Sequence, residues 1–508
     1  MNIIHTHKPH CICKLVRVTL QLFFILVIAA CSNGDGVKKV RTLKDVEGSR
    51  IGVQLGTTSD ILSSELERKS PATRVERFNK SADAIQALTQ GKIDCAIMDE
   101  QPAKAFCQSN SQLEILPEEF GHDDMAICIA LDNASLLRDI NQALADLHSA
   151  GVDTAIVNAH IERGASVAYK KDETLKREGV IRFGVNATFK PFEYYDKGSI
   201  VGIDIDLAQA ICDRLGRNME TVDMEFDAII TSVQTGKVDA GISGITVTEE
   251  RKKNVSFSQP YAAVSQVVVV NTGEVEMHSG IVEQFKSCFV TDGRYHYLLQ
   301  GLGNTLVITL FAAILSLLLG TIIAVIRATH QRNGNMRLLN MLCQLYIGIV
   351  RGTPTMVQVL IIYYVVFAAA NVDKILVAVI AFGLNSAAYI AEVIRSGIMS
   401  VDTGQMEAGR SLGLSYGKTM RLIILPQAFK NVLPALGNEL ITLLKETSIS
   451  GYIGLVDLTK GSDIIRSITY NAILPLGVVA CIYLAIVMAL SFGVSMLEKR
   501  LRRNERRQ

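Results

Sequence analysis

The 508-residue sequence lacks the features that mark several common classes of protein. Its ten cysteines include no Cys-x-x-Cys pair and no cluster with histidine, which argues against a disulfide framework and against a metal site. The formal net charge is only +1, so it gives no reason to expect a nucleic-acid partner. The Gly-x-x-x-x-Gly-Lys-Ser/Thr loop that holds nucleotide phosphates is also missing, and we expect the chain to bind no cofactor.

The composition is apolar for a wholly soluble protein, because 49% of the residues are hydrophobic and only 20% are charged. This apolarity is unevenly spread. Residues 38–290 carry charges throughout, whereas residues 300–497 contain long uncharged runs. The length predicts between two and four domains, and the uneven composition predicts an α/β domain followed by an all-α membrane domain.

Residues 1–31 have the layout of a targeting segment. Lys8, Lys14 and Arg17 precede an apolar run, Val18–Ala30, that is shorter than the about 20 residues of an ordinary span. The run ends at Cys31 and resembles a bacterial lipoprotein signal, which implies that Cys31 becomes the lipidated first residue. The alternative is an uncleaved signal anchor. Both alternatives export the residues that follow.

Five uncharged or nearly uncharged stretches predict membrane spans, since a helix of about 20 apolar residues crosses the roughly 30 Å hydrocarbon core. They are Gly301–Ile326, Gly352–Val372, Ile375–Ala391, Val432–Val456 and Ala472–Leu497. The fourth stretch is the least apolar because Glu439, Lys445 and Glu446 interrupt it. Ionisable residues at such a depth usually face a bundle interior or a water-filled path.

The basic residues outside these stretches predict the orientation. They gather after the first span (Arg327, Arg332, Arg337), between the third and fourth (Arg410, Lys418, Arg421, Lys430) and in the tail 499–508. Cytoplasmic loops collect Lys and Arg, so we expect these regions inside the cell and residues 38–290 outside. The prediction is a multi-pass protein of the bacterial cytoplasmic membrane with a basic cytoplasmic tail.

The segment 401–430 carries the most specific motif. Gln405–Gly413, followed by Ile424–Ala428, resembles the EAA loop of ABC importer permeases. The resemblance implies that this loop docks on a separate ATP-binding subunit, which hydrolyses the ATP, through Glu407, Ala408, Gly413 and Pro426. Gly409 stands where alanine is usual, and we expect it to loosen the helix by up to about 1 kcal/mol. We also expect Pro426 to limit the second short helix.

Three neighbouring segments extend this resemblance over residues 297–498. Arg351–Pro354, Asn385–Glu392 and Leu444–Ser448 resemble the polar-amino-acid branch of the same permeases. The resemblance implies a permease domain at 301–498. Because about five spans usually form half of a pore, it also implies a second copy of the chain or a related permease as partner.

The exported half alternates short β-rich runs with helical stretches. We predict strands at Arg50–Gln54, Ile93–Met98 and Val180–Val185, and helices at Ser59–Arg68 and Ile203–Leu215. Such alternation is typical of α/β layers around a parallel sheet.

Several of these segments resemble the family 3 periplasmic amino-acid-binding proteins, whose two lobes close on a ligand. Val180–Asn186, Pro191–Tyr194 and Gly202–Ala208 look like the beginning of that family. The segments that should follow Val267–Val270, starting near Leu43, instead come first in this chain. We infer a circular permutation; two half-domains left from a tandem pair, or lobes exchanged between subunits, are the alternatives.

The predicted division of the exported half follows from this permutation. Residues 38–165 form the second lobe and its closing helix, 166–178 a linker, and 179–275 the first lobe. We expect the chain to cross between lobes at Met125–Leu131 and Val264–Val270. Residues 276–300 form a tether with a helix at the membrane surface.

The resemblance also implies a binding site for a free amino acid. Arg251 corresponds to the carboxylate ligand, Asp99 to the ammonium partner, Gly56 and Thr58 to donors at a helix N-terminus, and Ser243, Gly244 and Thr246 to hydrogen-bonding groups of the first lobe. Phe189 and Phe226 correspond to rings that sandwich the ligand, or else they belong to the core. Asn186 stands where relatives that bind basic amino acids or glutamine usually carry aspartate. Without that carboxylate a strongly cationic ligand loses its partner, which favours glutamine or a similar neutral or acidic ligand.

These features together predict a substrate-binding and permease subunit of an ABC importer that is not itself an enzyme. The alternative is a ligand-gated ion channel or an amino-acid sensor that uses the same binding domain. A channel would place its pore between the two lobes and would have no use for the loop around Glu407.

Overall fold

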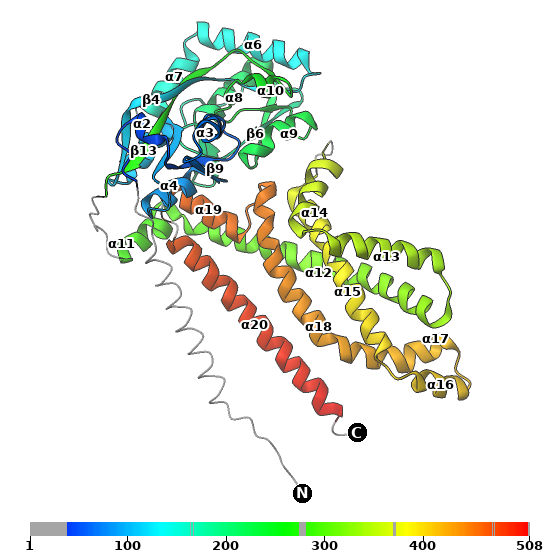
Figure 1. Cartoon of the computed structure of the whole chain (residues 1–508). Coiled ribbons are helices and arrows are strands. Elements are labelled where there is room, and N and C mark those ends of the chain that lie inside the picture. Colours follow the sequence, from blue (N-terminus) through cyan, green and yellow to red (C-terminus); the bar gives the residue numbers. More distant parts are fainter. Residues whose placement is uncertain are drawn as a thin grey trace.

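The computed structural model describes residues 38–162, 164–165, 167–273, 281–368, 372–469, 471 and 473–505. A two-lobed α/β domain lies at one end of the molecule, and a set of long helices extends away from it (Figure 1). The predicted targeting segment and Cys31 lie outside the described residues.

The second lobe is built on a five-stranded sheet with the order β2-β1-β3-β13-β4. Its elements are α2 (Leu43–Val46), β1 (Arg50–Gln54), α3 (Thr58–Lys69), β2 (Arg74–Phe78), α4 (Ser81–Thr89), β3 (Cys95–Asp99), α5 (Glu100–Ser109), β4 (Leu113–Met125) and β13 (Ala262–Asn271). Strand β1 is parallel to β2 and β3, as the alternation of strands and helices predicts. Strand β13 is antiparallel to β3 and β4 because it returns from the other lobe.

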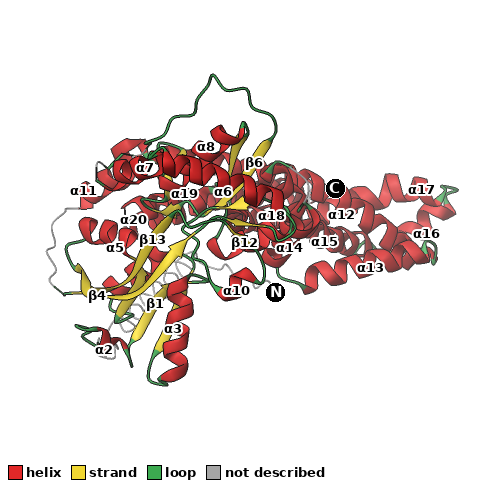
Figure 2. Cartoon of the chain, turned by 90° about the horizontal axis from the view of Figure 1, so that it is seen from above, coloured by secondary structure: helices red, strands yellow, loops and turns green. Residues whose placement is uncertain are grey.

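The first lobe contains a second sheet with the order β10-β6-β11-β5-β12 and a small sheet β7-β8-β9. Its elements are β5 (Cys128–Ile129), α6 (Ala134–Ser149), α7 (Val152–Ile161), β6 (Val180–Val185), β7 (Thr188–Phe189), β8 (Glu193–Asp196), β9 (Ser199–Val201), α8 (Ile203–Leu215), β10 (Asn218–Asp223), the 3₁₀ turn η1 (Phe226–Ala228), α9 (Ile229–Gln234), β11 (Ala240–Gly241), α10 (Glu249–Lys252) and β12 (Ser256–Phe257). Figure 2 shows helices α6, α7 and α8 close together over this lobe.

The chain passes between the lobes twice, once between β4 and β5 and once between β12 and β13. Each lobe therefore contains elements from two separate parts of the sequence. Elements β5, α6 and α7 pack with the first lobe, and β13 lies in the sheet of the second. The described part of 164–178 has no helix or strand. Two carboxylates of α8 hold it, because Asp206 accepts from the amides of Ala168 and Tyr169, and Asp213 from that of Asp172.

All the described elements of the C-terminal part are helices or helical turns. It comprises α11 (Ile281–Phe285), the π turn η2 (Lys286–Val290), the 3₁₀ turn η3 (Thr291–Gly293), α12 (Tyr295–Asn333), α13 (Arg337–Gly352), α14 (Thr355–Ile361), the π turn η4 (Ile362–Val366), α15 (Lys374–Met399), α16 (Thr403–Ser411), α17 (Tyr416–Thr419), the π turn η5 (Met420–Ile424), α18 (Leu425–Glu446), the 3₁₀ turn η6 (Thr447–Ile453), α19 (Leu458–Thr469) and α20 (Ile473–Glu505).

Three of these helices, α12, α15 and α20, are long and apolar enough to cross a membrane. The pair α13 and α14–η4 qualifies as a fourth span if its bend of 109° is counted as a break within one span. The predicted span Gly352–Val372 differs from this arrangement. Pro354 disfavours helix at Thr353, so the chain breaks there, and the helix α13 before the break was not predicted.

Helix α18, the fourth predicted span, is 22 residues long but is not among the candidate spans of the described chain. Its charged residues Glu439, Lys445 and Glu446 explain the difference. It packs against α15 and α20 inside the helical part (Figure 1). With the bent pair counted as one span, the described chain has four candidate spans against the predicted five. Helix α18 is the remaining predicted stretch.

Candidate functional site

A narrow cavity of about 30 Å³ lies between the two lobes. Eight of the ten predicted ligand-binding residues line it: Thr58, Asp99, Asn186, Phe189, Phe226, Ser243, Gly244 and Thr246. The cavity is much smaller than the 300 Å³ or more of a typical ligand pocket because side chains of the two lobes meet across it. The remaining two predicted residues, Gly56 and Arg251, form one of the contacts that join the lobes.

Arg251 lies on α10 and is only 7% exposed. Its guanidinium donates to the carbonyl of Thr246 in its own lobe and to the carbonyl of Gly56 in the other, both at 2.7 Å. Burial lowers the pKa of this side chain, although the nearby carboxylates of Asp123 and Asp99 oppose the effect. The two bonds use two of its five N–H donors, so a guanidinium here has further donors with which to bind a carboxylate.

Asp99 ends β3 at the edge of the cavity. Burial raises its pKa to about 7, with a further contribution from Asp123, while a hydrogen bond from the Gln266 amide and the charge of Arg251 oppose the rise. The same Gln266 accepts a hydrogen bond from the hydroxyl of Ser59 on α3. Asp99 therefore changes charge close to neutral pH, and an ammonium group beside it would favour its ionised form.

The N-terminus of α3 points at the same cavity. The Thr57 hydroxyl caps the helix by accepting from the Asp60 amide. The buried hydroxyl of Thr58 has no hydrogen-bond partner among the described residues. Gly56 has φ +77°, a conformation that glycine adopts readily, and this turn directs its carbonyl to Arg251. A helix N-terminus with a hydroxyl that is not yet satisfied suits an anionic group of a ligand.

Asn186 takes part in a buried hydrogen-bond network that joins the lobes. Its amide nitrogen donates to the carbonyl of Met224, and its amide oxygen accepts from Thr188 and, across the cleft, from Gln54. Its backbone amide donates to the hydroxyl of Ser243. This wall of the cavity is therefore made of neutral groups.

The two predicted aromatic residues contact different parts of the site. Phe189 stacks on Phe192 with ring centroids 5.5 Å apart and packs over Gly244, where a side chain would approach the ring to 2.9 Å. Phe226 lies under the Arg251 guanidinium, 5.6 Å from its ring centroid. Both rings line the cavity, and Phe189 also packs against the core of the first lobe.

The sequence analysis missed a pair of buried carboxyls beneath the cavity. Glu193 is 0% exposed, accepts from the Ser243 hydroxyl and lies against Asp204, which accepts from Tyr261 and from the Gly244 amide. Burial, then the neighbouring Asp204, raises the pKa of Glu193 well above its usual value, and burial raises that of Asp204 to about 6.

A proton shared by these two carboxyls satisfies the atoms that face each other, Glu193 Oε2 and Asp204 Oδ1, which receive no other hydrogen bond within the described chain. Both residues sit in segments that resemble the binding-protein family, Pro191–Tyr194 and Gly202–Ala208. The signal that could have found them is an acidic residue directly beside apolar positions of a predicted strand or helix start.

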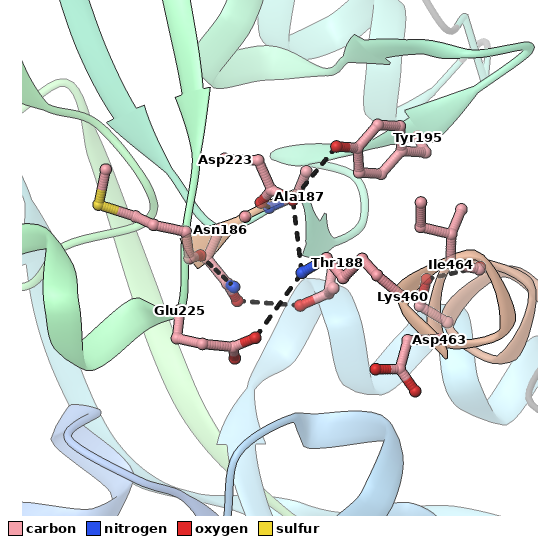
Figure 3. Close-up of polar contacts among 12 residues, drawn as sticks. Asn186, Ala187, Thr188, Tyr195, Asp223, Glu225, Lys460, Asp463 and Ile464 are labelled. Carbon is pink, nitrogen blue, oxygen red and sulfur yellow. Dashed lines mark hydrogen bonds and ion pairs between the residues drawn. The ribbon is translucent and has the colours of Figure 1, made fainter. Parts of the chain in front are cut away.

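The binding domain contacts helix α19 through ion pairs from both lobes, and Figure 3 shows the pairs of Lys460 with the first lobe. Lys460, 1% exposed, lies 3.4 Å from the Asp223 carboxylate and 3.7 Å from that of Glu225, both in the first lobe. From the second lobe, Lys80 contacts Asp463 at 2.5 Å, and Asp83 on α4 pairs with Arg466. Helix α19 therefore contacts both lobes in this closed arrangement.

Asp223 connects this junction to the cleft. One of its oxygens accepts from the Ala187 amide, next to Asn186, and the other accepts from the Tyr195 hydroxyl and faces Lys460 (Figure 3). Nothing in the sequence separated Asp223 from ordinary surface carboxylates, because its partner lies 237 positions further along the chain.

At the far end of the helical part, α16, α17 and η5 form the loop that contains the predicted coupling residues (Figure 1). Glu407, Ala408, Gly413 and Pro426 are all exposed. Leu412 is 81% exposed, and Leu422 and Phe429 are also exposed, so the surface has apolar residues available for a partner.

One expectation for this loop was wrong, and a second was incomplete. Pro426 does not limit a helix but lies in the first turn of α18, where its missing N–H costs little. Gly409 is buried, and a Cβ there would lie 2.5 Å from Thr419 Cγ2. The glycine therefore permits close packing of α16 against η5, rather than simply loosening the helix.

The fold and site thus define a two-lobed ligand-binding domain joined to a set of membrane helices. Residues 181–460 match the family described as bacterial extracellular solute-binding proteins, family 3. The C-terminal part is 38% identical to the arginine transport system permease protein ArtQ of Bacillus subtilis, over 41% of this chain and 94% of that protein. It is 41% identical to a putative glutamine transport system permease protein GlnP of Rickettsia bellii, over 38% and 89%.

One solved structure with a comparable overlap is a crystal structure of an amino acid ABC transporter with histidines. It is 40% identical, covers 42% of this chain and 98% of that one, and has a TM-score of 0.38. The chain belongs to the family 3 solute-binding proteins and, in its C-terminal part, to the amino-acid ABC transporter permeases. It is a membrane protein that combines the two.

Proposed function

We propose that the chain is the substrate-binding and permease subunit of an ABC importer for a polar amino acid. The single observation that carries the proposal is that one chain contains both a cleft with Arg251 and Asp99 and, at its opposite end, an exposed EAA-like loop around Glu407. A guanidinium and a carboxylate on facing lobes suit the carboxylate and ammonium groups of an amino acid.

The substrate is glutamine or a similar neutral or acidic amino acid. The side chains of Asn186 and Gln54 at the inner wall are neutral amides. The raised pKa of Glu193 keeps its carboxyl protonated. None of these three groups therefore supplies a fixed negative charge for a cationic side chain. Amide groups and a protonated carboxyl can both donate and accept, which suits the side-chain amide of glutamine.

The partners are an ATP-binding subunit, which uses ATP, and a second copy of the chain or a related permease. The basic segments that follow α12, lie between α15 and α18, and end α20 are all on the side away from the binding domain (Figure 1). The preference of cytoplasmic loops for Lys and Arg supports a binding domain outside the cell and the Glu407 loop inside.

The order of the two lobes is best explained by a circular permutation within one chain. Val40, at the start of the described chain, and Val270, near the end of β13, pack in the same core cluster. In a chain of conventional order these two residues would be near neighbours in the sequence. Their closeness here is what a permutation within one chain predicts.

The test is transport by purified protein. The chain is purified from membranes of its host, co-purifying ATPases are identified by mass spectrometry, and both are placed in liposomes. We expect uptake of labelled glutamine or a related amino acid that requires ATP. Ion current without ATP, or failure to associate with any ATPase, would contradict the proposal.

A further inference from the structure

A second cavity, of about 410 Å³, lies between the binding domain and the membrane helices. One side is formed by residues of the second and first lobes, including Leu55, Asp227 and Thr231. The other side is formed by α14, η4 and η6 through residues such as Leu360 and Tyr364. Its volume is within the range of pockets that hold small molecules.

This cavity adjoins the cleft between the lobes. Phe226 lines both cavities, and Leu55, which lines the second, directly follows Gln54, which lines the first. One aromatic ring and the turn that begins at Leu55 therefore separate the ligand cleft from a larger space that opens towards the membrane helices.

The walls of this second cavity carry both carboxylates and hydroxyls, which suit a small polar ligand. The carboxylates of Glu225 and Asp227 lie on the lobe side, and the hydroxyls of Tyr364 and Tyr452 on the membrane side. Glu225 Oε2 and Tyr364 Oη are buried atoms without a hydrogen-bond partner in the described part of the chain. Buried polar atoms are rarely left unsatisfied, so these two atoms call for a polar occupant.

The charges indicate which end of a ligand would bind. Glu225 is 3.7 Å from Lys460, whereas Asp227 has no ion pair within 4.0 Å among the described residues. Lys460 is shared with Asp223, and Lys80, whose charge also acts on Glu225, is paired with Asp463. Asp227 is therefore the carboxylate of this wall without a paired cation among the described residues, which favours an ammonium group there. Leu55, Phe226 and Leu360 supply apolar contact for the rest of a small ligand.

We propose that this cavity is a transit site, in which an amino acid leaving the cleft past Phe226 is held by its ammonium group at Glu225 and Asp227 before it enters the membrane helices. The inference rests on the proposed import function and adds a second binding site for the same class of substrate. A lipid chain or detergent in the cavity is the competing occupant.

The experiment uses a bulky residue that fills the second cavity without touching the first. Thr231 lines only the second cavity and is exposed on α9, so Thr231→Trp would occupy it. The matched control is Thr235→Trp, one turn further along and outside both linings. Both variants are compared with wild type for glutamine binding by calorimetry and for ATP-dependent uptake in liposomes with the co-purified ATPase.

We expect Thr231→Trp to bind glutamine within about twofold of wild type while its uptake falls at least about tenfold, and Thr235→Trp to match wild type in both assays. Unchanged uptake by Thr231→Trp would overturn the transit site. So would equal loss of binding and uptake, because the second cavity would then not be separate from the cleft. If wild type itself does not transport, the proposed function fails and the inference with it.

A second variant covers the possibility that tryptophan prevents folding. Asp227→Asn removes one carboxylate with little change in shape, and Glu250→Gln, at an exposed position of α10, is its control. We expect Asp227→Asn to raise the KM of uptake about tenfold with unchanged binding to the cleft. An unchanged KM would mean that the cavity holds no ammonium group and would favour the lipid or detergent.

Discussion

Arg251 links the two lobes, and we propose that it also binds the carboxylate of the ligand. Its guanidinium donates two hydrogen bonds to backbone carbonyls of different lobes, those of Thr246 and Gly56. A ligand that accepts hydrogen bonds from the remaining N–H donors of Arg251 would therefore stabilise the closed arrangement of the lobes. This is the property a binding protein needs if closure is to depend on the ligand.

Replacing Arg251 tests this role. We expect Arg251→Ala to weaken amino-acid binding by about 2 kcal/mol or more, roughly 30-fold in Kd, since one partner of a buried charged hydrogen bond is lost. Arg251→Lys should recover only part, because an ammonium lacks the planar fork of donors. Calorimetry on the full chain measures both, with exposed Lys252→Ala as the control. Wild-type affinity in Arg251→Ala would exclude this residue from the site.

Asp99 makes a separate prediction about pH. Its pKa is raised to about 7 in the folded protein, so its contribution to stability is fully present below about pH 4 and is lost as the pH rises through 7. Ligand affinity should change in the opposite direction, because only the ionised carboxylate pairs with ammonium. We expect Kd to rise as the pH falls from 8 to 6, with a proton released on binding.

Calorimetry in buffers with different ionisation enthalpies detects that proton. Asp99→Asn should bind more weakly and lose most of the pH dependence. If the dependence persists in Asp99→Asn, another group of the cleft must titrate; Asp123, whose pKa burial also raises, is the nearest alternative.

Among elements, α19 is the one that relates the binding domain to the membrane helices. It pairs Lys460 with the first lobe and Asp463 and Arg466 with the second. Since separating the lobes would move their contacting residues apart, all these pairs can form together only in a limited range of lobe positions. We expect α19 to bind the closed domain more tightly than the open one.

Lys460→Met tests this coupling. It leaves the buried carboxylates of Asp223 and Glu225 without their cation, and breaking such a pair costs about 3 kcal/mol or more. We expect normal ligand binding, a lower unfolding temperature of the full chain, and loss of ligand-stimulated ATPase activity. Adding Asp223→Asn should restore part of the stability, because the amide carries no buried charge; purely additive losses would contradict the pairing.

The loop around Glu407 gives a second prediction at this scale. Gly409→Ala should gain about 1 kcal/mol in helix propensity but lose more, because the new methyl group meets Thr419 Cγ2, and overpacking typically costs about 1–3 kcal/mol. We expect weaker ATPase association and lower uptake. Thr419→Ser removes that methyl, so the double variant Gly409→Ala/Thr419→Ser should recover activity. No recovery would mean that the defect arises elsewhere.

Elements with strong local patterns were predictable from the sequence. The predicted bounds of β1, β6 and α8 agree with the structure residue for residue, because each has a clear period and a flanking turn. Helix α13 was missed because its uncharged run, Leu338–Val350, is shorter than a membrane span. The contacts of Lys460, Asp223 and Glu193 could not be read from local patterns, since they depend on tertiary packing.

At the scale of the whole molecule, the order of the lobes places the pore directly after the last strand of the binding domain. Strand β13 lies inside the sheet of the second lobe, and after residues 274–280 the chain continues into α11 and η2, which packs against α12 and α19. A conventional order would end the binding domain after α7, on the first lobe. The order found here therefore connects the membrane helices to the lobe that carries Asp99 and Thr58.

A rearranged chain tests whether one polypeptide forms the complete binding domain. The soluble form would begin at residue 179, join Asn271 directly to Val40 and end at residue 162, which restores the usual family order. We expect a monomer by light scattering that binds the same amino acid within about threefold of the 38–273 fragment, gaining about 2.7 kcal/mol of stability at a hundredfold the Kd. The packing of Val40 and Val270 in one cluster favours this result. A rearranged chain that binds only as a dimer would instead show that lobes are exchanged between subunits, and the cleft of Arg251 and Asp99 would then belong to two chains.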